Sequence, residues 1–452
     1  MNKQEFISEF ARHIIRSDTS LFLGAGSSCS VGFPNWSKLL EECSEKLKLK
    51  GKNETNLFAV AQYYSNKYGR SELTKIVKSV FYDFKYESEL LNSIMDLSFK
   101  NIWTTNYDQI IEKNLAAKKI TSTSIIRDID LTSIDPKVEV NIYKLNGDLS
   151  DLDNIVITTS DIEQYSAKHE LLLTFFKKEL ITNTFLFLGY SFTDSIVLPC
   201  LSLVSNCFNN ASGYHYTIIE KSRRSDFEPF IEDLERRYHI KTLIVKSNND
   251  IPEILSELKK KIESYRIFIS GSFIKLNSDQ DKFANCLTKK LTEKILEKYQ
   301  IISGMGYKLG NYISGYGLNY LSEKHISNIE HHLIMRPFAE HMQDDQIQNH
   351  RENLISRCRF VIFLFGDSRK RSDRHNSLGV WQEYQTAKKL NKIIIPVGST
   401  GYETRNIYND ICKNKTNFPY LERYLDTLGT SENVDKIVDV IMKIISDVNV
   451  RG

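Results

Sequence analysis

The sequence predicts an α/β protein of two domains, each built around a parallel sheet, with a helical insertion in the first. Short β-rich runs alternate with amphipathic segments of helix length along nearly the whole chain, which is the pattern of parallel sheets. The chain has 452 residues, more than a single hydrophobic core usually supports. Its composition, 41% hydrophobic and 26% charged, is typical of a folded globular protein and argues against disorder.

The first domain is expected to span residues 1–264. Between Pro34 and Lys100 the pattern is helical only, which predicts a helical insertion over the edge of the sheet. A helix expected at 251–264 closes the domain and places the boundary near residue 264. Seven strands are expected, at residues 20–24, 102–105, 139–145, 154–158, 184–189, 215–220 and 241–245.

The second domain is expected to span residues 265–452. Each of its predicted strands is followed by a segment of helix length, as in the first domain. This repeated order of strand and helix predicts that both domains are Rossmann-like. Five strands are expected here, at residues 265–270, 299–303, 332–336, 359–365 and 392–397.

Charge and hydropathy exclude some classes of function. Sixty basic and 57 acidic residues give a formal charge of +3, which disfavours a nucleic-acid-binding protein. The N-terminus is polar, and no stretch approaches the roughly 18 apolar residues that a membrane span needs. We therefore expect a cytoplasmic protein without nucleic-acid or membrane partners.

The cysteines predict reduced thiols and no metal site. They are seven in number and include no Cys-x-x-Cys pair, so a four-cysteine zinc ribbon is excluded. We expect no zinc and no other metal. The cysteines are Cys29, Cys43, Cys200, Cys207, Cys286, Cys358 and Cys412.

A glycine-rich turn follows the first predicted strand. Gly24-Ala25-Gly26-Ser27 is followed a few residues later by Phe33-Pro34-Asn35-Trp36. Glycines let a backbone approach a pyrophosphate closely, and free N–H groups at the start of the next helix can bind its oxygens. The third glycine of Gly-x-Gly-x-x-Gly is absent, so a purely structural turn remains the alternative.

Two further strands end in polar turns. One ends in Thr104-Thr105-Asn106-Tyr107-Asp108, and the other in Lys144-Leu145-Asn146-Gly147-Asp148. Ligands of open parallel sheets bind at the carboxyl ends of the strands, so these turns and the glycine turn can converge on one crevice. Taken separately, the two asparagines are turn or capping residues more often than catalysts.

In their order along the chain, these motifs and Phe187-Leu188-Gly189-Tyr190-Ser191 resemble the sirtuin family over about residues 10–260. The resemblance implies that Asn106 lies beside the nicotinamide ribose of NAD and positions water at C1′, with Asp108 supporting its loop. It implies that Gly24, Ala25, Gly26 and Ser27 hold the pyrophosphate, and that Gly189, Tyr190 and Ser191 lie near the adenosine half. Pro34 and Trp36 are also expected to bind NAD.

Two departures from the sirtuin pattern define the expected subtype. The zinc-binding cysteine pairs of sirtuin deacylases are absent, which favours an NAD hydrolase over a lysine deacylase. Asn146 stands where the family has its catalytic His, and an amide cannot act as a general base near neutral pH. The chain is then either a His-to-Asn inactivated form that holds substrate or a natural variant relying on Asn106 alone. We favour the inactivated form.

The second domain contains the elements of a phosphate and ribose pocket. Two small-residue turns, Ser270-Gly271-Ser272 and Gly304-Met305-Gly306, follow its first two predicted strands. Arg351 precedes the fourth strand, and the run Arg369-Lys370-Arg371 follows it, suited to gripping phosphate. Glu383, expected on the first turn of a helix, can accept hydrogen bonds from ribose hydroxyls. Structural turns, a solvated charge run and helix-dipole compensation are the alternatives.

These features resemble the SLOG superfamily, relatives of the "lonely guy" phosphoribohydrolases, over about residues 265–448. The Pro-Gly-Gly-x-Gly-Thr loop of the hydrolases is not preserved, which favours ligand sensing over catalysis in this domain. A sirtuin-like domain followed by a SLOG domain is similar to the effectors of Thoeris antiphage defence. That resemblance implies an NAD+ hydrolase that depletes cellular NAD, in abortive infection, when a cyclic ADP-ribose isomer from a TIR-domain partner binds the SLOG domain.

The Thoeris resemblance also implies a homotetramer or higher assembly, and no cofactor beyond NAD as substrate. Two alternatives remain. The chain can be a non-catalytic nucleotide-binding regulatory or scaffold protein, which the missing His favours. Alternatively, chemistry can reside in the second domain as a nucleotide phosphoribohydrolase, which its missing glycine loop disfavours.

Overall fold

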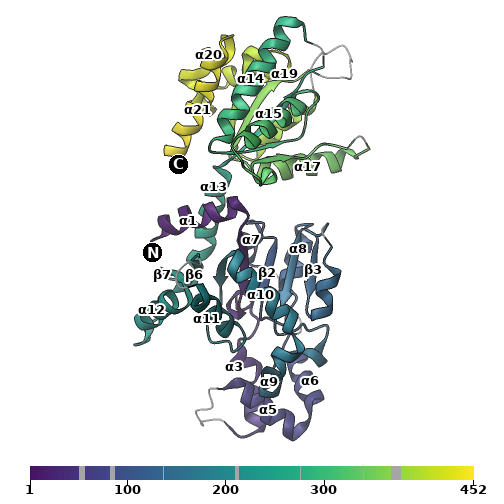
Figure 1. The fold of residues 1–452 in the computed structure, drawn as a ribbon, viewed down its shortest axis with the longest axis vertical. Helices are drawn as coiled ribbons and strands as arrows, with labels where there is room; N and C mark the ends of the chain where they lie inside the picture. Colours follow the sequence, from purple (N-terminus) through teal and green to yellow (C-terminus); the bar gives the residue numbers. More distant parts are fainter. Residues whose placement is uncertain are drawn as a thin grey trace. The chain divides into compact units, whose positions relative to one another are not determined.

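The computed structural model describes residues 1–49, 56–81, 87–135, 137–208, 213–274, 276–339, 341–367 and 378–451. The chain folds into two compact units, Met1–Lys259 (unit 1) and Lys260–Gly452 (unit 2) (Figure 1). Each unit contains one parallel sheet covered by helices, so the predicted α/β class is confirmed. None of the helices in the described ranges is both long enough and apolar enough to cross a membrane.

Unit 1 is built on a seven-stranded sheet in the order β3-β4-β2-β1-β5-β6-β7, and all of its strand pairs are parallel. The strands β4 and β5 are buried along their whole length, as expected where helices cover both faces of a sheet. The strands are β1 (Thr19–Leu23), β2 (Asn101–Thr104), β3 (Ser122–Ile125), β4 (Val140–Lys144), β5 (Thr184–Leu188), β6 (His215–Glu220) and β7 (Ile240–Val245).

The helices of unit 1 pack against this sheet or extend beyond it. Aromatic side chains fill much of the space between sheet and helices: Trp103 stacks on Tyr143, and Phe176 of α10 contacts Phe22. The α-helices are α1 (Lys3–Arg16), α2 (Ala25–Cys29), α3 (Trp36–Leu39), α4 (Glu41–Lys46), α5 (Leu57–Tyr68), α6 (Arg70–Val80), α7 (Glu89–Met95), α8 (Ile110–Ala117), α9 (Thr159–Lys168), α10 (Glu170–Thr182), α11 (Val197–Phe208), α12 (Phe227–Tyr238) and α13 (Ile251–Glu263). The 3-10 helices are η1 (Asp128–Ser133), η2 (Leu152–Asn154) and η3 (Asn248–Asp250).

The helical insertion predicted between the first two strands is present in the described residues as α3 to α7. Four of its helices share a small core of their own with Tyr107, Ile155 and Ile157, which follow strands β2 and β4. In Figure 1 the helices α3, α5, α6 and α9 gather beyond one end of the sheet. The insertion therefore lies beside the carboxyl ends of these strands, where the polar turns were predicted to converge.

Two strand predictions in unit 1 were wrong. Residues 154–158 form the end of η2 and a loop, because the apolar run Ile155-Val156-Ile157 is buried outside the sheet, and Thr158 caps α9 by accepting the N–H of Asp161. The strand β3 was missed because its sequence, Ser-Thr-Ser-Ile, is short and mostly polar. It is an edge strand that pairs only with β4, so most of its side chains are half exposed.

Unit 2 is built on a five-stranded parallel sheet in the order β10-β9-β8-β11-β12, and each of its strands was predicted. The strands are β8 (Arg266–Ser272), β9 (Gln300–Ser303), β10 (Leu333–Met335), β11 (Phe360–Phe365) and β12 (Ile393–Pro396). The helices are α14 (Ser278–Leu296), α15 (Leu309–Glu323), α16 (Ile329–His332), α17 (Asp344–Ser356), α18 (Leu378–Lys389), α19 (Tyr402–Lys413), α20 (Leu425–Thr430) and α21 (Val434–Arg451), with 3-10 helices η4 (Gly398–Thr400), η5 (Lys415–Asn417) and η6 (Pro419–Tyr424).

Both sheets contain a point at which the strand order reverses. In unit 1 the chain builds the sheet outward from β1 through β2 to β3, and then returns to place β5 on the other side of β1. In unit 2 the reversal lies between β8 and β11. Crevices at the carboxyl ends of strands beside such a switch point are where open α/β sheets bind ligands.

Candidate functional site

At the switch point of unit 1, the main chain of the turn after β1 packs directly on the main chain of the turn after β5. Gly24 donates its N–H to the Leu188 carbonyl oxygen over 3.0 Å, and Gly26 donates its N–H to the Gly189 carbonyl oxygen over 2.9 Å. A Cβ atom on Gly24 would lie 2.5 Å from the Gly189 carbonyl oxygen, and one on Gly189 would lie 2.5 Å from the Ser27 nitrogen. These positions require glycine because the turns after β1 and β5 approach each other too closely for any side chain.

This packing corrects one expectation about the glycine turn. Free N–H groups at the start of the helix after the glycine turn were expected to bind a pyrophosphate; in the structure the Gly26 N–H is donated to Gly189 and the Ser27 N–H to the Gly24 carbonyl oxygen over 3.0 Å. The Ser27 hydroxyl is buried and also donates to Gly24, over 2.6 Å. Among the described residues, Ala25 and Gly26 line the adjoining cavity, whereas Gly24 and Ser27 lie behind them.

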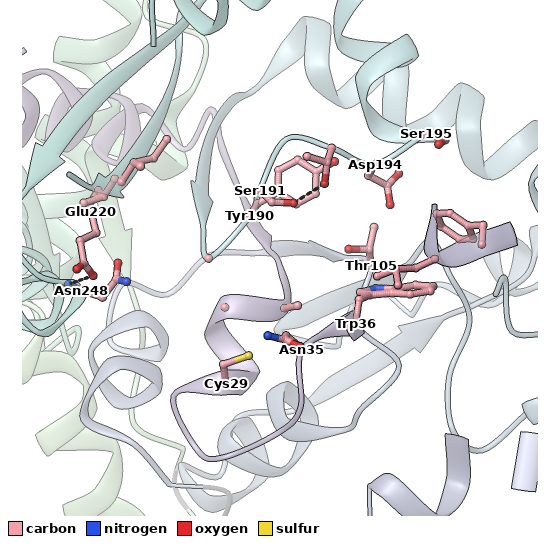
Figure 2. Close-up of a pocket in the computed structure, with 18 of the residues that line it drawn as sticks. Cys29, Asn35, Trp36, Thr105, Tyr190, Ser191, Asp194, Ser195, Glu220 and Asn248 are labelled. Carbon is pink, nitrogen blue, oxygen red and sulfur yellow. Dashed lines mark hydrogen bonds between the residues drawn. The ribbon is translucent and has the colours of Figure 1, made fainter. Parts of the chain in front are cut away.

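A cavity of about 820 Å³ lies at the switch point of unit 1 (Figure 2). Its volume falls within the range of small-molecule and cofactor sites. Six of the predicted NAD-binding residues line it: Ala25, Gly26, Trp36, Gly189, Tyr190 and Ser191. The other described lining residues are Cys29, Asn35, Asn56, Leu57, Phe58, Thr105, Thr193, Asp194, Ser195, Ile218, Ile219, Glu220 and Asn248.

The two ends of this cavity differ in the strands that build them. Figure 2 shows Glu220 and Asn248 at one end and Trp36, Thr105 and Asp194 at the other. Adjacent strands lie about 4.8 Å apart, so the stretch from the end of β2 to the end of β6 covers roughly 14 Å. Sequence reasoning missed Glu220 and Asn248, although an acidic residue at a strand's carboxyl end is a recognisable signal.

A smaller hollow adjoins the end formed by Trp36 and Thr105, and these two residues with Ala25 line both spaces. Pro34, Asn106 and Asp108, which the sequence assigned to the NAD site, line this hollow. The structure thus brings the turn after β1, the Phe-Pro-x-Trp motif and the turn after β2 to one place.

A hydrogen-bond chain fixes the Asn106 side chain. Its Nδ2 donates to the Ser28 hydroxyl over 2.9 Å and to the Gly24 carbonyl oxygen over 3.1 Å. The Ser28 hydroxyl in turn donates to Asp108 Oδ2 over 2.7 Å, and Asp108 Oδ1 accepts the Ile110 N–H over 3.1 Å. Because Nδ2 is held by the protein, Asn106 Oδ1 is the atom left to bind a water or a substrate group. Burial raises the pKa of the Asp108 carboxyl, which the bond from Ser28 opposes.

Asn146, at the family's His position, is fully buried at the end of β4, next to the turn that carries Asn106. Among the described residues, neither polar atom of its amide has a hydrogen-bond partner of good geometry. The amide nevertheless lies close enough to the Asp194 carboxyl to lower its pKa, although burial dominates and raises that pKa overall. Asp194 Oδ1 also accepts the N–H groups of Ile196 and Val197, at 2.8 and 3.1 Å, at the start of α11.

A buried ion cluster joins the turns after β2 and β4. Lys144 is fully buried; its ammonium bonds to the Asp148 carboxylate, lies 3.1 Å from Glu112 Oε1 and donates to the Asp108 carbonyl oxygen over 2.5 Å. Burial alone would raise the pKa of Asp148, but the Lys144 ammonium and hydrogen bonds from Ser150 lower it overall. The lysine of the Lys-Leu-x-Gly motif therefore supports the loop that carries Asn106.

In unit 2 the structure brings three predicted residues together below the switch point. The Ser270 hydroxyl donates to Glu383 Oε2 over 2.5 Å, and both side chains are buried. Burial raises the pKa of the Glu383 carboxyl, against the hydrogen bond from Ser270 and the positive charge of Arg351. Arg351 lies over the Phe338 ring at 5.7 Å and donates to Gln348 over 2.8 Å.

The two small-residue turns of unit 2 contact each other. Gly271 has a φ of +153°, and a Cβ atom there would overlap the Leu364 carbonyl oxygen. A Cβ on Gly306 would overlap the Gly271 carbonyl oxygen, while Gly304 lies against the Phe338 ring. Met305 adopts a φ of 54°, and its N–H bonds to the Ser303 hydroxyl. These residues are held by packing in the same way as the glycines of unit 1.

The Ser272 hydroxyl donates to the Asp367 carbonyl oxygen over 2.6 Å and so ties β8 to the end of β11. Glu383 is the sixth residue of α18 as described, so its prediction on the first turn was wrong. Arg369, Lys370 and Arg371 lie outside the described residues. Within the described ranges, no cluster of three His, Cys, Asp or Glu residues is arranged to hold a metal.

Comparison with known families assigns both halves of the chain. A family model described as a SIR2-like domain matches residues 100–243. A second, described as the Sir2- and TIR-associating SLOG family, matches residues 250–448. The two resemblances drawn from the sequence motifs are therefore confirmed.

Four curated proteins that are similar to the chain over most of its length share the name NAD(+) hydrolase ThsA, and three of them illustrate the likeness. The one from Bacillus cereus (strain MSX-D12) is 30% identical, over 90% of this chain and 89% of that protein. The one from Enterococcus faecium is 30% identical, over 99% of each. The one from Cytobacillus dafuensis is 29% identical, over 98% of this chain and 96% of that protein.

Proposed function

Because the chain belongs to the family of the ThsA NAD(+) hydrolases, we propose that unit 1 hydrolyses NAD+ to nicotinamide and ADP-ribose. The observation that carries the proposal is the cavity of about 820 Å³ at the switch point of unit 1. Its volume suits a dinucleotide, and the hollow that contains Asn106 adjoins one of its ends.

In this proposal NAD+ lies across the ends of β2, β1, β5 and β6. The nicotinamide ribose occupies the end near Thr105 and Asn106, and the adenosine half occupies the end near Gly189 and Glu220. The pyrophosphate passes over Ala25 and Gly26, where the absence of bulky side chains leaves room for it. No metal and no cofactor beyond the substrate are needed for this arrangement.

Hydrolysis of the bond between nicotinamide and C1′ depends more on a positioned water molecule than on a strong base. Breaking the bond between nicotinamide and C1′ gives an oxocarbenium-like state, and water adds to C1′ with loss of one proton to solvent. Asn106 Oδ1 accepts a hydrogen bond from that water and orients its oxygen toward C1′. The hydrogen bonds to Ser28 and Gly24 keep the amide from rotating, so the acceptor is in place before substrate arrives.

Whether this chain turns over NAD+ depends on Asn146, which stands at the position of the family's catalytic His. Imidazole at this position could accept a proton, whereas the Asn146 amide cannot. We propose that the chain is an inactivated His-to-Asn form that holds NAD+ without efficient turnover. The fully buried Asn146 amide beside the Asp194 carboxyl supports this proposal, because it occupies the family's His position without a group that can take up a proton.

We further propose that unit 2 controls unit 1 in the cytoplasm during antiphage defence. A cyclic ADP-ribose isomer, made by a TIR-domain partner, would bind near Ser270, Arg351 and Glu383 and activate NAD+ depletion, with the chain assembled as a tetramer or larger. The signal raises activity only if it binds the active arrangement more tightly than the inactive one. The SLOG match and the buried Ser270–Glu383 pair support ligand binding in this unit.

The second candidate function is that of a nucleotide-binding regulatory protein without turnover, which Asn146 favours. One experiment separates the two: nicotinamide release from NAD+ is measured for the unchanged chain and for Asn146→His, with and without cyclic ADP-ribose isomers. We expect Asn146→His to release nicotinamide about 10²-fold faster with the activating isomer. Release by neither chain would contradict the hydrolase proposal, and release by both at equal rates would contradict the inactivation.

A further inference from the structure

Asp194 lines the end of the cavity that the proposed function gives to the nicotinamide ribose. It follows strand β5 and lies at the same end as Trp36 and Thr105 (Figure 2). Thr105 also lines the hollow that contains Asn106, so this end of the cavity adjoins the amide that orients the water. A carboxylate is therefore present near the place where water attacks C1′ in the proposed function.

The two oxygens of the Asp194 carboxyl have different surroundings. Oδ1 accepts the N–H groups of Ile196 and Val197, at 2.8 and 3.1 Å, and so holds the side chain at the start of α11. Oδ2 has no hydrogen-bond donor of good geometry among the described residues, although the Asn146 amide lies near the carboxyl. One oxygen therefore fixes the side chain, and the other is available to a water molecule in the cavity.

No cation among the described residues lines the cavity beside Asp194, because the lining contains no lysine, arginine or histidine. Burial raises the pKa of Asp194, against the two backbone hydrogen bonds and the Asn146 amide. A carboxylate with a raised pKa accepts a proton more readily, as a general base must. Burial, and to a smaller extent the negative charge of Asp194, raises the pKa of four neighbouring side chains, which are neutral near neutral pH: Tyr107, Tyr165, Tyr190 and Cys200.

We propose that Asp194 is the general base of this chain and that its Oδ2 accepts the proton lost by the attacking water. The inference rests on the proposed function, since it assumes that NAD+ occupies the cavity with its nicotinamide ribose at this end. The bond between C1′ and the nicotinamide nitrogen breaks, and its electron pair goes to that nitrogen. The water oxygen bonds to C1′, and one water proton passes to Asp194 and from there to solvent.

Asn106 and Asp194 then divide the work on the water molecule. Asn106 orients its oxygen, and Asp194 takes up its proton, which the Asn146 amide cannot do. The slow hydrolysis that remains in a chain without the family's His therefore depends on the Asp194 carboxylate.

The substitution Asp194→Asn removes the base while keeping the oxygen that accepts the N–H groups of Ile196 and Val197. Nicotinamide release from saturating NAD+ is measured for the full chain, with and without cyclic ADP-ribose isomers. We expect Asp194→Asn to be at least about tenfold slower than the unchanged chain. Its NAD+ affinity, measured by isothermal titration calorimetry, should stay within about threefold, because the proton is taken up only during the reaction. Asp194→Glu keeps a carboxylate and should retain more of the rate than Asp194→Asn.

The dependence of the rate on pH separates a base from a carboxylate that only caps a helix. A base must be ionised, and its raised pKa means that Asp194 takes up its proton at a higher pH than an ordinary aspartate. The kcat/KM of the unchanged chain should therefore fall from pH 8 to pH 5, and that of Asp194→Asn should fall less steeply. Thermal melting at each pH shows that both chains are folded. If Asp194→Asn does not fold, Asp194→Ser takes its place, because a serine hydroxyl also caps a helix.

Asp153→Asn is the matched control, because Asp153 is an exposed aspartate of η2 that lines neither the cavity nor the hollow. It should keep the rate and the pH profile of the unchanged chain. Equal rates in the unchanged chain and a folded Asp194→Asn, whether measurable or zero, overturn the role of Asp194. The hydrolase proposal then still stands if Asn146→His releases nicotinamide. Absence of release from both the unchanged chain and Asn146→His overturns both proposals.

Discussion

The Asn106 amide nitrogen donates a hydrogen bond to the Ser28 hydroxyl over 2.9 Å, and together with its bond to the Gly24 carbonyl oxygen this contact leaves Oδ1 as the end of the amide that can act on a ligand. Ser28 is itself a donor to Asp108, so its hydroxyl oxygen is oriented to accept from Asn106. The two hydrogen bonds in series therefore hold the Asn106 amide in one orientation.

Asn106→Ala should therefore lower the rate of nicotinamide release while leaving NAD+ affinity largely unchanged. In the Asn146→His chain, where turnover is expected, we predict a fall of about 10²-fold in kcat, the usual effect of losing one preorganised polar group. Ser28→Ala should give a smaller fall, because Asn106 keeps its bond to Gly24. Asn92→Ala, on the exposed face of α7, is the control. A full rate in Asn106→Ala would remove Asn106 from the mechanism.

Lys144→Met should destabilise unit 1 by about 3–5 kcal/mol, because it leaves Asp148 as a buried and uncompensated carboxylate. The measurement is urea unfolding followed by tryptophan fluorescence, with the exposed Lys168→Met as control. Lys144→Met combined with Asp148→Leu should recover part of the loss, since the unpaired charge is then removed. A single-variant loss below about 1 kcal/mol would show that the cluster is not a support of the site.

His215 should make unit 1 less stable as the pH falls. Burial lowers the pKa of His215 to about 4, and its Nδ1 accepts the Phe185 N–H over 3.1 Å, which requires that nitrogen to be unprotonated. The unfolded chain, in which the pKa of His215 is about 6.5, binds a proton that the folded chain excludes between these two values. Stability due to His215 is therefore complete above about pH 6.5 and falls by about 3 kcal/mol as the pH drops to about 4.

His215→Asn keeps an acceptor for the Phe185 N–H and removes the titration. Its free energy of unfolding, measured by urea denaturation from pH 7 to pH 4, should fall less steeply than that of the unchanged chain. His341→Gln replaces an exposed histidine and should follow the unchanged chain. Parallel curves for all three chains would show that His215 titrates normally in the folded state.

Arg351→Ala and Glu383→Ala should each abolish activation by a cyclic ADP-ribose isomer without changing NAD+ affinity in unit 1. Ser270 donates a hydrogen bond to Glu383, and the positive charge of Arg351 acts on the same carboxyl, so either variant disturbs the proposed signal pocket. Activation is measured as the ratio of nicotinamide release with and without the isomer, in the Asn146→His chain. Lys289→Ala, on the exposed face of α14, should be activated normally. Undiminished activation of both variants would show that the signal does not bind at Arg351 and Glu383.

The sequence predicted most of the fold because its strands are short apolar runs bounded by turns, and the helical insertion followed from the same patterns. The error at residues 154–158 arose because an Ile-Val-Ile run is equally apolar in a strand and in a buried loop. The missed strand β3 shows the opposite case, in which a polar edge strand carries no hydrophobic pattern. Local periodicity reports burial, and burial does not by itself define a strand.

The site was predictable where a motif lies on one strand end and unpredictable where contacts join distant segments. Asn106 and Gly189 were found as parts of motifs, whereas the roles of Ser28 and Lys144 depend on partners 78 and 36 residues away. That the Gly26 N–H is already donated could not be read from its motif for the same reason, since the Gly189 carbonyl that accepts it follows another strand. Glu220 could have been noticed, because it ends a predicted strand.

The glycine contacts at the switch point also constrain how this cavity can change during evolution. Part of its wall is main chain at Gly26 and Gly189, and neither position has room for a side chain. New ligand preferences must therefore arise through the walls, at positions such as Trp36 and Glu220. Single substitutions in the walls can therefore change which nucleotide binds, while the main chain at the glycines keeps the bound ligand in the same position.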